Sequence, residues 1–267
     1  MVFLRHAALS FVLHAAIILK NCTMEYTLSH LGTTGSTNRE AQERIKAMPV
    51  GSHAFLTADY QTEGQGRGSN QWYSEPGKNL LMSWISFPAF LSVRTQFQLS
   101  KAVSLAICEL LTPRVDSVAI KWPNDILVGD RKAGGILIEV NVQGSSIRHA
   151  VTGIGLNVNQ EVFPGFPFPA TSLCLETGRT TEMEPLRDEL INLLLERYRE
   201  LEQGDHRRID NVYLSRLYGM GQLRSFRTEG ELIRGEITGL SETGELLVRS
   251  MGKERSYGMH EITMLHD

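Results

Sequence analysis

Nine residues, GQGRGSNQW at 64–72, combine three glycines with one arginine and one tryptophan. Glycines at alternate positions remove side chains, so backbone amides can approach a ligand closely, and clusters of such amides favour anions. Arg67 adds a planar group with five donors, and Trp72 adds a flat apolar face. This composition predicts a phosphate-binding loop. The alternative is a mobile surface loop with one buried tryptophan.

Two familiar phosphate loops do not fit the spacing. Ser69 occupies the position that would complete G-x-G-x-x-G, and no G-K-[ST] follows the glycines. Neither a Rossmann dinucleotide loop nor a P-loop is indicated.

A second stretch with chemical potential is KWPNDILVGDRKAGGILIEV at 121–140. Pro123 excludes a continuous helix, and the GDRK segment predicts a hairpin bend. Paired strands on either side of that bend could bring the Asp125 carboxylate and the Lys132 ammonium together. Gly134 and Gly135 are expected to leave room beside Lys132 for a ligand or a second backbone. The alternative is a plain hairpin without a site.

Composition limits the function classes. The chain has 267 residues, 42% of them apolar, which is enough for one substantial core and a small second one. The net charge of −3 gives no global field to attract nucleic acid or an anionic membrane, so any anion site must be local. Three cysteines lie far apart, and no histidine or cysteine spacing is typical of zinc sites. We therefore expect a reducing compartment and no structural metal.

The first twenty residues are apolar but are interrupted by His6, Ser10 and His14. They barely reach the length of a membrane span and lack a convincing signal-peptidase site. Because Met24 stands directly before the first strand-like segment, we expect translation to begin there. The alternative is secretion.

Helical and strand patterns alternate along the chain. The pattern predicts helices at 36–48, 93–112, from the Thr181/Glu184 pair to a stop at Gly204, and at 206–217. Thr37/Glu40 and Thr181/Glu184 have capping-box spacing. Strands are predicted at 25–31, 53–61, 79–87, 117–122, 132–142 and 147–159. Beyond Tyr218, short alternating runs with regular glycines predict a small barrel, whose alternative reading is a packing module without chemistry.

Five motifs occur in the order of a known family: STN at 36–38, DYQTEGQGRGSNQW at 59–72, KWPND at 121–125, DRKAGGILIE at 130–139 and GIGLNVN at 153–159. Over residues 25–267 the chain resembles the biotin protein ligases, in particular the kind without an N-terminal DNA-binding domain. No helix-turn-helix pattern precedes residue 24, so we do not expect transcriptional repression.

The resemblance implies an α+β fold in which helices flank a mixed β-sheet, like that of class II aminoacyl-tRNA synthetases, followed by a C-terminal SH3-like β-barrel. We expect an N-terminal extension at 1–23, a catalytic domain at 24–217 and the barrel at 218–267. Substrates would be biotin and ATP with Mg²⁺, which give biotinyl-5′-AMP. A lysine of a biotin carboxyl carrier domain would then displace AMP. A cytoplasmic enzyme that binds no nucleic acid or membrane is implied. Both a monomer and a homodimer are compatible with the resemblance.

Site roles follow from the same resemblance. The catalytic residues would be Lys132, Arg67 and Asp125, with Asp125 orienting, or orienting and deprotonating, the incoming lysine. Biotin would contact Ser36, Thr37, Asn38, Gln61, Gln65, Gly66, Arg67, Lys132 and Gly135. ATP or the adenylate would contact Gly64, Gly66, Arg67, Trp72, Lys121, Asn124, Arg131, Lys132 and Asn157.

One departure from the family pattern is Gln65, which stands where a cation is common in the glycine loop. Either looser closure of the loop or weaker ATP binding is therefore expected. The alternatives are a lipoate-type ligase of the same fold, whose RR-x-S-GGG-type signature is not found, and a catalytically weak biotin-binding protein, against which Lys132, Arg67 and Asp125 speak.

Overall fold

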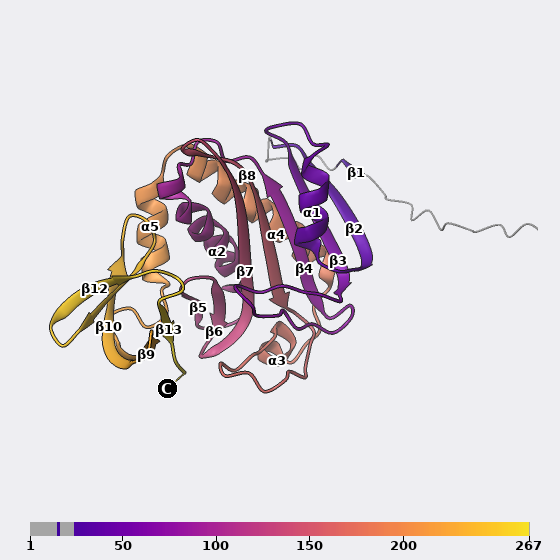
Figure 1. Ribbon diagram of the computed structural model, residues 1–267. Helices are drawn as coiled ribbons and strands as arrows, with labels where there is room; N and C mark the ends of the chain where they lie inside the picture. Colours follow the sequence, from indigo (N-terminus) through magenta and orange to yellow (C-terminus); the bar gives the residue numbers. More distant parts are fainter. Residues whose placement is uncertain (1–14, 17–23, 267) are drawn as a thin grey trace, which may run out of the picture.

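The computed structural model describes residues 15–16 and 24–266, and its centre is an eight-stranded sheet in the order β1-β2-β3-β4-β8-β7-β6-β5 (Figure 1). β2 and β3 run parallel because α1 connects them, and the other neighbouring pairs are antiparallel. The mixed sheet predicted from the sequence is confirmed. Its strands are β1 (Ala15–Ala16), β2 (Tyr26–Thr34), β3 (His53–Gln61), β4 (Asn79–Ser86), β5 (Val118–Lys121), β6 (Asp125–Val128), β7 (Arg131–Gln143) and β8 (Ser146–Asn157).

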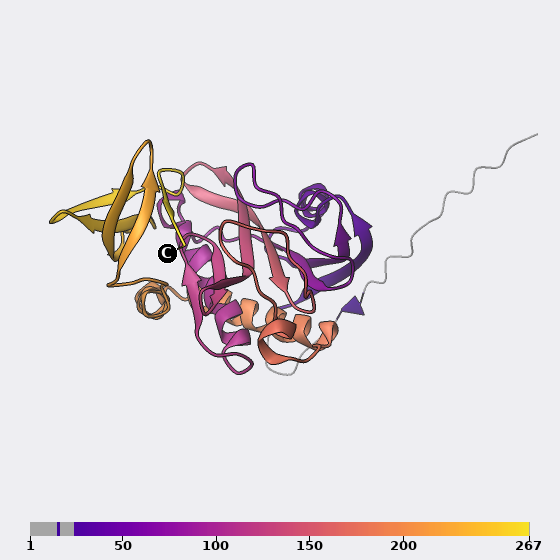
Figure 2. The same cartoon turned by 90° about the horizontal axis from the view of Figure 1, so that it is seen from below.

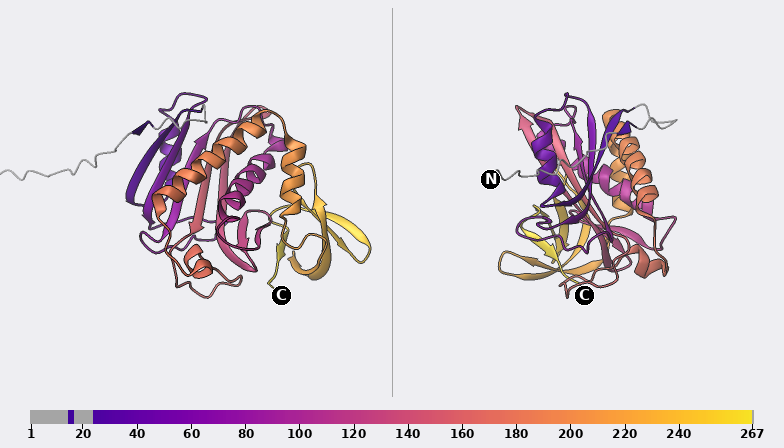
Figure 3. Two further views of the ribbon diagram at one scale, coloured as in Figure 1. Left: turned by 180° about the vertical axis from the view of Figure 1, so that it is seen from behind. Right: turned by 90° about the vertical axis from the view of Figure 1, so that its right-hand side faces the viewer.

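Helices lie on both faces of this sheet (Figure 3). α1 (Thr37–Ile45) packs against β3, β4 and β8 on one face. α2 (Phe97–Leu111) and α4 (Met183–Glu202) pack against each other on the opposite face, and α5 (His206–Ser215) packs against α2. The short helices η1 (Val93–Thr95) and α3 (Leu173–Thr177) were not predicted separately.

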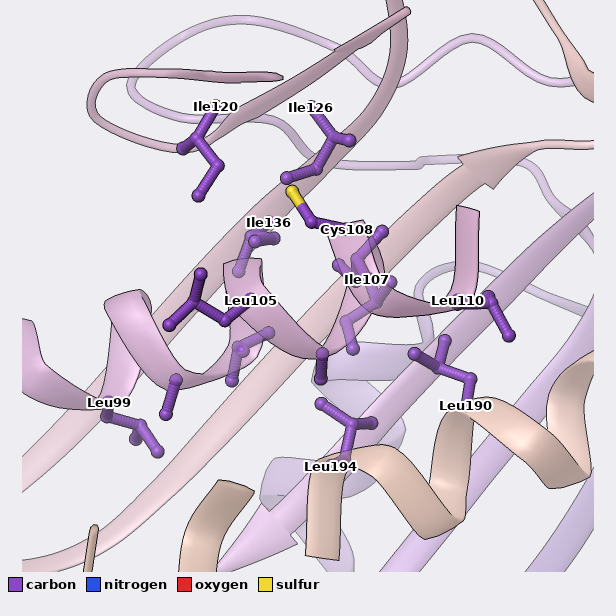
Figure 4. Close-up of a cluster of buried hydrophobic side chains, with 14 of the residues drawn as sticks. Leu99, Leu105, Ile107, Cys108, Leu110, Ile120, Ile126, Ile136, Leu190 and Leu194 are labelled. Carbon is purple, nitrogen blue, oxygen red and sulfur yellow. The ribbon is translucent and has the colours of Figure 1, made fainter. Parts of the chain in front are cut away.

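The main apolar core fills the space between the sheet and the α2–α4 layer. Figure 4 shows leucines of α2 and α4, such as Leu110, Leu190 and Leu194, pointing toward one another. A separate small cluster lies under α1 and consists of Ala41, Ala54, Leu56, Ile85 and Val151. One large and one small core were expected, and both are present.

The N-caps of α1 and α4 differ from those predicted from the sequence. α1 begins with Ser36 as its N-cap, and Glu40 accepts a hydrogen bond from the Thr34 hydroxyl, so the predicted Thr37/Glu40 capping box is wrong. Glu182, not Thr181, is the N-cap of α4. The Thr181 amide donates to Asn159 Oδ1 at 2.8 Å. The stop at Gly204 is confirmed by its φ of +83° directly after the helix end.

The C-terminal strands form a separate antiparallel sheet in the order β12-β11-β10-β9-β13, at one end of the molecule (Figure 2). Its strands are β9 (Leu223–Thr228), β10 (Leu232–Leu240), β11 (Leu246–Ser250), β12 (Lys253–Tyr257) and β13 (Ile262–Met264). Among residues 218–266 no ladder joins the two edge strands, so closure into a barrel stays a prediction.

This second sheet docks firmly on the first part of the chain. The Trp122 indole N–H donates to the Gly244 carbonyl at 2.9 Å. A Cβ on Gly244 would lie 2.2 Å from Phe97 Cγ of α2, so only glycine allows this approach. Phe226, Ile237 and Leu246 belong to the same apolar cluster as α2. The contact places the C-terminal segment beside the turn that carries Asp125.

The predictions about a start at Met24 and about secretion concern residues 1–23, which lie outside the described part of the chain apart from Ala15–Ala16. Over the described residues, no helix combines the length and the apolar character that a membrane crossing requires.

Candidate active site

A cavity of about 400 Å³ opens on the sheet face that carries α1. Its wall comes from the first turn of α1, the end of β3, the glycine loop, the β5–β6 turn, β7, β8 and the segment 259–264. A volume of this size suits a small organic ligand. Most predicted site residues line it: Ser36, Thr37, Asn38, Gln61, Gln65, Gly66, Arg67, Trp72, Lys121, Asn124, Asp125, Lys132 and Gly135.

One end of the cavity is an ion-paired cluster around Asp125. Lys132 Nζ lies 2.5 Å from Asp125 Oδ1, and Lys121 Nζ lies 3.5 Å from Oδ2. The Asp125 side chain is only 15% exposed, so these pairs are poorly screened by water. The prediction that the hairpin brings Asp125 and Lys132 to one place is confirmed.

A β-bulge at Ala133 produces this meeting. Leu127 pairs with Lys132, and Asp125 pairs with Gly135. Between these two pairs β6 advances by two residues and β7 by three, so β7 carries one extra residue. Because directly opposed residues share a face of the sheet, the extra residue puts both Lys132 and Gly135 on the face of Asp125. A regular ladder would have opposed Asp125 to Gly134 instead.

The glycine loop folds back on itself as a small hairpin. The Gly66 amide donates to the Asn70 carbonyl at 2.9 Å, and the Trp72 amide donates to the Gly64 carbonyl at 2.9 Å. A Cβ on Gly64 would lie 2.7 Å from the Trp72 carbonyl oxygen, so this glycine is needed for the fold of the loop.

Arg67 is the cation that this loop contributes to the cavity. Partial burial lowers the pKa of its guanidinium, and the negative charge of Asp125 acts in the opposite direction. Arginine keeps its charge in proteins, so Arg67 adds a third positive charge near Asp125.

Trp72 lies flat across two glycines that face each other on β7 and β8. A Cβ on Gly155 would lie 2.4 Å from Trp72 Cε2, and one on Gly135 would lie 3.0 Å from Cζ3. The predicted close approach is present at both glycines: an added Cβ on Gly134 would lie 3.1 Å from the Gly155 carbonyl oxygen, and Gly135 lines the cavity beside the indole ring. Lys132 Nζ lies 5.6 Å from the ring centroid, which is cation–π range. The buried Trp72 Nε1 has no hydrogen-bond partner among the described residues.

The other end of the cavity is polar and uncharged. The backbone amide of Thr37 donates to Gln61 Oε1 at 2.7 Å, and the Thr37 hydroxyl lies 3.0 Å from the same oxygen. A backbone amide can only donate, so the accepting atom of Gln61 must be its oxygen and the other atom must be its NH₂ group. Ser36, the N-cap, makes no capping hydrogen bond with its side chain.

Three predicted site residues lie outside the cavity lining: Gly64, Arg131 and Asn157. Gly64 shapes the loop, as above. Arg131 is half exposed and pairs with Glu176 at 2.8 Å. Asn157 is buried and donates to the Thr171 carbonyl at 2.9 Å. The Thr171 amide in turn donates to the Lys132 carbonyl, so Asn157 holds Thr171 beside Lys132.

Sequence reasoning missed the C-terminal contribution. Met259, His260, Ile262, Thr263 and Met264 line the cavity, and none of them was among the predicted site residues. No local signal could have found them, because their position depends on the docking of the second sheet. Gly153 and Gly155 also line it, and the quoted motif GIGLNVN contained them.

Burial lowers the pKa of Lys121, and Asp125 partly offsets this effect. Asp125 is the one acidic side chain among the described residues that line the cavity. Nowhere in the described residues do three or more His, Cys, Asp or Glu side chains gather closely enough to hold a metal ion. The site therefore offers cations for anionic groups and no set of metal ligands.

Residues 32–157 match the biotin/lipoate A/B protein ligase family. The biotin–[acetyl-CoA-carboxylase] ligase of Paracoccus denitrificans is 30% identical over 234 residues, which cover 82% of this chain and 92% of that protein. The bifunctional ligase/repressor BirA of Bacillus spizizenii is 30% identical over 238 residues, or 87% of this chain and 72% of that protein.

Among solved structures, the biotin protein ligase of Aquifex aeolicus in complex with biotin and ATP superposes with a TM-score of 0.75 at 26% identity. The match covers 90% of this chain and 99% of that one. Sequence motifs, fold and these relatives agree, and the chain belongs to the biotin/lipoate A/B protein ligase family, among the biotin protein ligases.

Proposed function

We propose that this chain activates biotin with ATP and transfers it to a lysine of a biotin carboxyl carrier domain. In the first step a biotin carboxylate oxygen attacks the α-phosphorus, the bond to the bridging oxygen of the β-phosphate breaks, and pyrophosphate leaves. In the second step a neutral lysine amine attacks the acyl carbonyl of biotinyl-5′-AMP. The C–N bond forms, AMP leaves and the amine proton passes to solvent.

The observation that carries this proposal is the division of one cavity into two chemically different ends. Lys132, Lys121 and Arg67 surround Asp125 at one end, and Gln61, Thr37 and Ser36 form the other. A ligand with an uncharged polar ring and a distant carboxylate fits this division. Biotin has both, whereas the dithiolane ring of lipoate offers nothing to the polar end.

Joining a carboxylate to a phosphate requires that their mutual repulsion be offset by fixed cations. Lys132 is the best-placed candidate, since it lines the cavity and its ammonium is held 2.5 Å from Asp125 Oδ1. Arg67 approaches from the loop side. We assign both to the carboxylate and α-phosphate, and Trp72 to the wall beside the adenylate.

Asp125 is assigned to positioning. Its two oxygens already face Lys132 and Lys121, so it holds these cations in place. This engagement favours the expected role of orienting the incoming lysine over that of deprotonating it.

Mg²⁺ would enter with ATP. Asp125 is the only carboxylate in the described lining and is ion-paired, so the residues present do not make a protein site for this ion. The triphosphate and water would supply its oxygen ligands.

The remaining expectations stay proposals: a catalytic unit at 24–217 and a C-terminal unit at 218–267, a cytoplasmic location, no binding of nucleic acid or membrane, and an oligomeric state that is either monomer or homodimer. The carrier domain is the proposed partner because the second step needs an accessible lysine amine at the cavity.

The direct test is transfer. The purified chain is incubated with biotin, Mg²⁺–ATP and an isolated biotin carboxyl carrier domain, and the carrier is weighed by mass spectrometry. We expect one added biotinyl group, and none on a carrier whose acceptor lysine is replaced by arginine. Transfer of lipoate in preference to biotin, or no transfer of either, would overturn the proposal.

A further inference from the structure

A chain of hydrogen bonds runs beneath the polar end of the cavity and ends on a carboxylate. Asn38 Nδ2 donates to Glu139 Oε2 at 2.7 Å, and its second hydrogen points to the Leu137 carbonyl at 3.4 Å. Ser83 Oγ lies 2.6 Å from Asn38 Oδ1 and 2.7 Å from Thr37 Oγ1. The Thr37 backbone amide then donates to Gln61 Oε1 at 2.7 Å.

The network fixes the orientation of Asn38. Glu139 and the Leu137 carbonyl can only accept, so the amide nitrogen must face them and Oδ1 must face Ser83. Asn38 also packs closely on the backbone of Gly153, where an added Cβ would lie 2.5 Å from Asn38 Oδ1. The orientation therefore depends on Glu139, at the far end of the chain of contacts.

Ser83 links the oriented Asn38 side chain to Thr37 in the cavity wall. Its side chain is completely buried on β4, and its hydroxyl lies within hydrogen-bond distance of both the Thr37 and the Asn38 side chains. Neither Ser83 nor Glu139 lines the cavity. They can act on a ligand only through Asn38, Thr37 and Gln61.

Four elements are joined in this way: α1, β3 with Gln61, β4 with Ser83 and β7 with Glu139 (Figure 1). The sheet order separates β7 from β4 by one strand and from β3 by two. These contacts hold the first turn of α1 against three strands and thereby fix the position of the Gln61 side chain. Because Gln61 Oε1 accepts from Thr37, the NH₂ group of Gln61 is the part that can donate to a ligand. A buried network of this kind is strong only when every member is satisfied.

We propose that Glu139 and Ser83 are positioning residues for the ring-binding end of the cavity. They hold Asn38, Thr37 and Gln61 in one arrangement, in which Gln61 presents a donor to an acceptor group of the ligand. This inference rests on the proposed function, because it takes the occupant of the polar end to be the ureido ring of biotin.

The test measures biotin binding by calorimetry and the KM for ATP by pyrophosphate release, at saturating biotin, for Glu139→Ala, Glu139→Gln and Ser83→Ala. Glu139→Ala leaves the Asn38 amide without its acceptor, so we expect the dissociation constant of biotin to rise about tenfold or more, with the KM for ATP within about twofold. Glu139→Gln keeps a carbonyl acceptor and should restore biotin affinity to within about threefold. Ser83→Ala should resemble Glu139→Ala.

Ser86→Ala is the matched control. Ser86 is a second fully buried serine of β4, and its hydroxyl has no hydrogen-bond partner among residues 24–266. It should bind biotin like the wild type. If the wild type binds no biotin, the proposed function fails. If the wild type binds biotin and Glu139→Ala binds it equally well, the positioning role is refuted. It is also refuted if the KM for ATP rises in Glu139→Ala by the same factor as the dissociation constant of biotin.

Discussion

Lys132 is the residue on which the proposed chemistry depends most, because it is held in the cavity by both Asp125 and the face of Trp72. A cation that matters chiefly in the transition state lowers turnover more than ligand affinity when it is removed. Its role and those of the other site residues are predictions that kinetics can separate.

Lys132→Ala is expected to slow pyrophosphate release about a hundredfold or more, while the dissociation constant of biotin changes much less. Arg131→Ala removes the neighbouring cation, which is half exposed and paired with Glu176, and should leave turnover within about threefold. Steady-state kinetics and calorimetry on both variants give the comparison. Equal losses of turnover and biotin affinity in Lys132→Ala would make Lys132 an ordinary binding residue.

At the level of elements, the facing glycines of β7 and β8 decide where Trp72 lies. Gly155→Ala would put a Cβ 2.4 Å from the indole, so the ring must leave its position. We expect pyrophosphate release to fall at least tenfold and the free energy of unfolding to fall by about 1 to 3 kcal/mol. Gly165→Ala is the control, because nothing lies within 4 Å of the Cβ it would add. Unchanged turnover in Gly155→Ala would show that the observed position of Trp72 is dispensable.

His53, the first residue of β3, should make the stability of the protein depend on pH. His53 is buried against Trp84, whose Nε1 lies 3.3 Å from His53 Nδ1, and burial lowers the pKa of His53 to about 4. The unfolded chain, with a pKa near 6.5, therefore binds more protons between these two values, and the free energy of unfolding falls as pH falls through this window. At pH 5 the loss from this group is about 2 kcal/mol relative to pH 7.

The measurement compares chemical denaturation of the wild type and His53→Gln at pH 7 and pH 5. The variant lacks the titrating ring, so its loss of stability between the two pH values should be smaller. Equal losses in both proteins would contradict a neutral, buried His53.

The sequence predicted the elements better than their junctions. The glycine loop, the bend after β6 and the meeting of Asp125 with Lys132 could be predicted, since turn residues and strand alternation are local signals. The bulge at Ala133 and the filling of the glycine pair by Trp72 could not, because both depend on contacts between strands distant in sequence. Glu139 was quoted within a motif, but its partner Asn38 lies 101 positions away.

On the scale of the whole molecule, the cavity is completed only when the C-terminal sheet is docked. Gly244 makes the docking contact in a left-handed conformation, with a φ of +88°, directly against Phe97. Gly244→Ala should therefore loosen the C-terminal sheet and withdraw residues 259–264 from the cavity. We expect slower pyrophosphate release and faster proteolysis between α5 and β9.

Gly252→Ala separates docking from backbone strain. Gly252 has a similar φ of +75°, but nothing lies within 4 Å of an added Cβ. The two variants share the strain and differ in the contact, so only Gly244→Ala should alter proteolysis and turnover. If Gly252→Ala changed proteolysis and turnover as much as Gly244→Ala, backbone strain alone would explain the effect, and the docking contact would not be needed.

The most direct test of the central claim is adenylate formation by the isolated chain. With biotin and Mg²⁺–ATP but no carrier domain, we expect a rapid release of about one pyrophosphate per chain, followed by slow turnover, because biotinyl-5′-AMP stays in the cavity. The burst should require biotin and should be absent in Lys132→Ala. No release in the presence of biotin, or the same release without it, would contradict the claim that this cavity joins biotin to ATP.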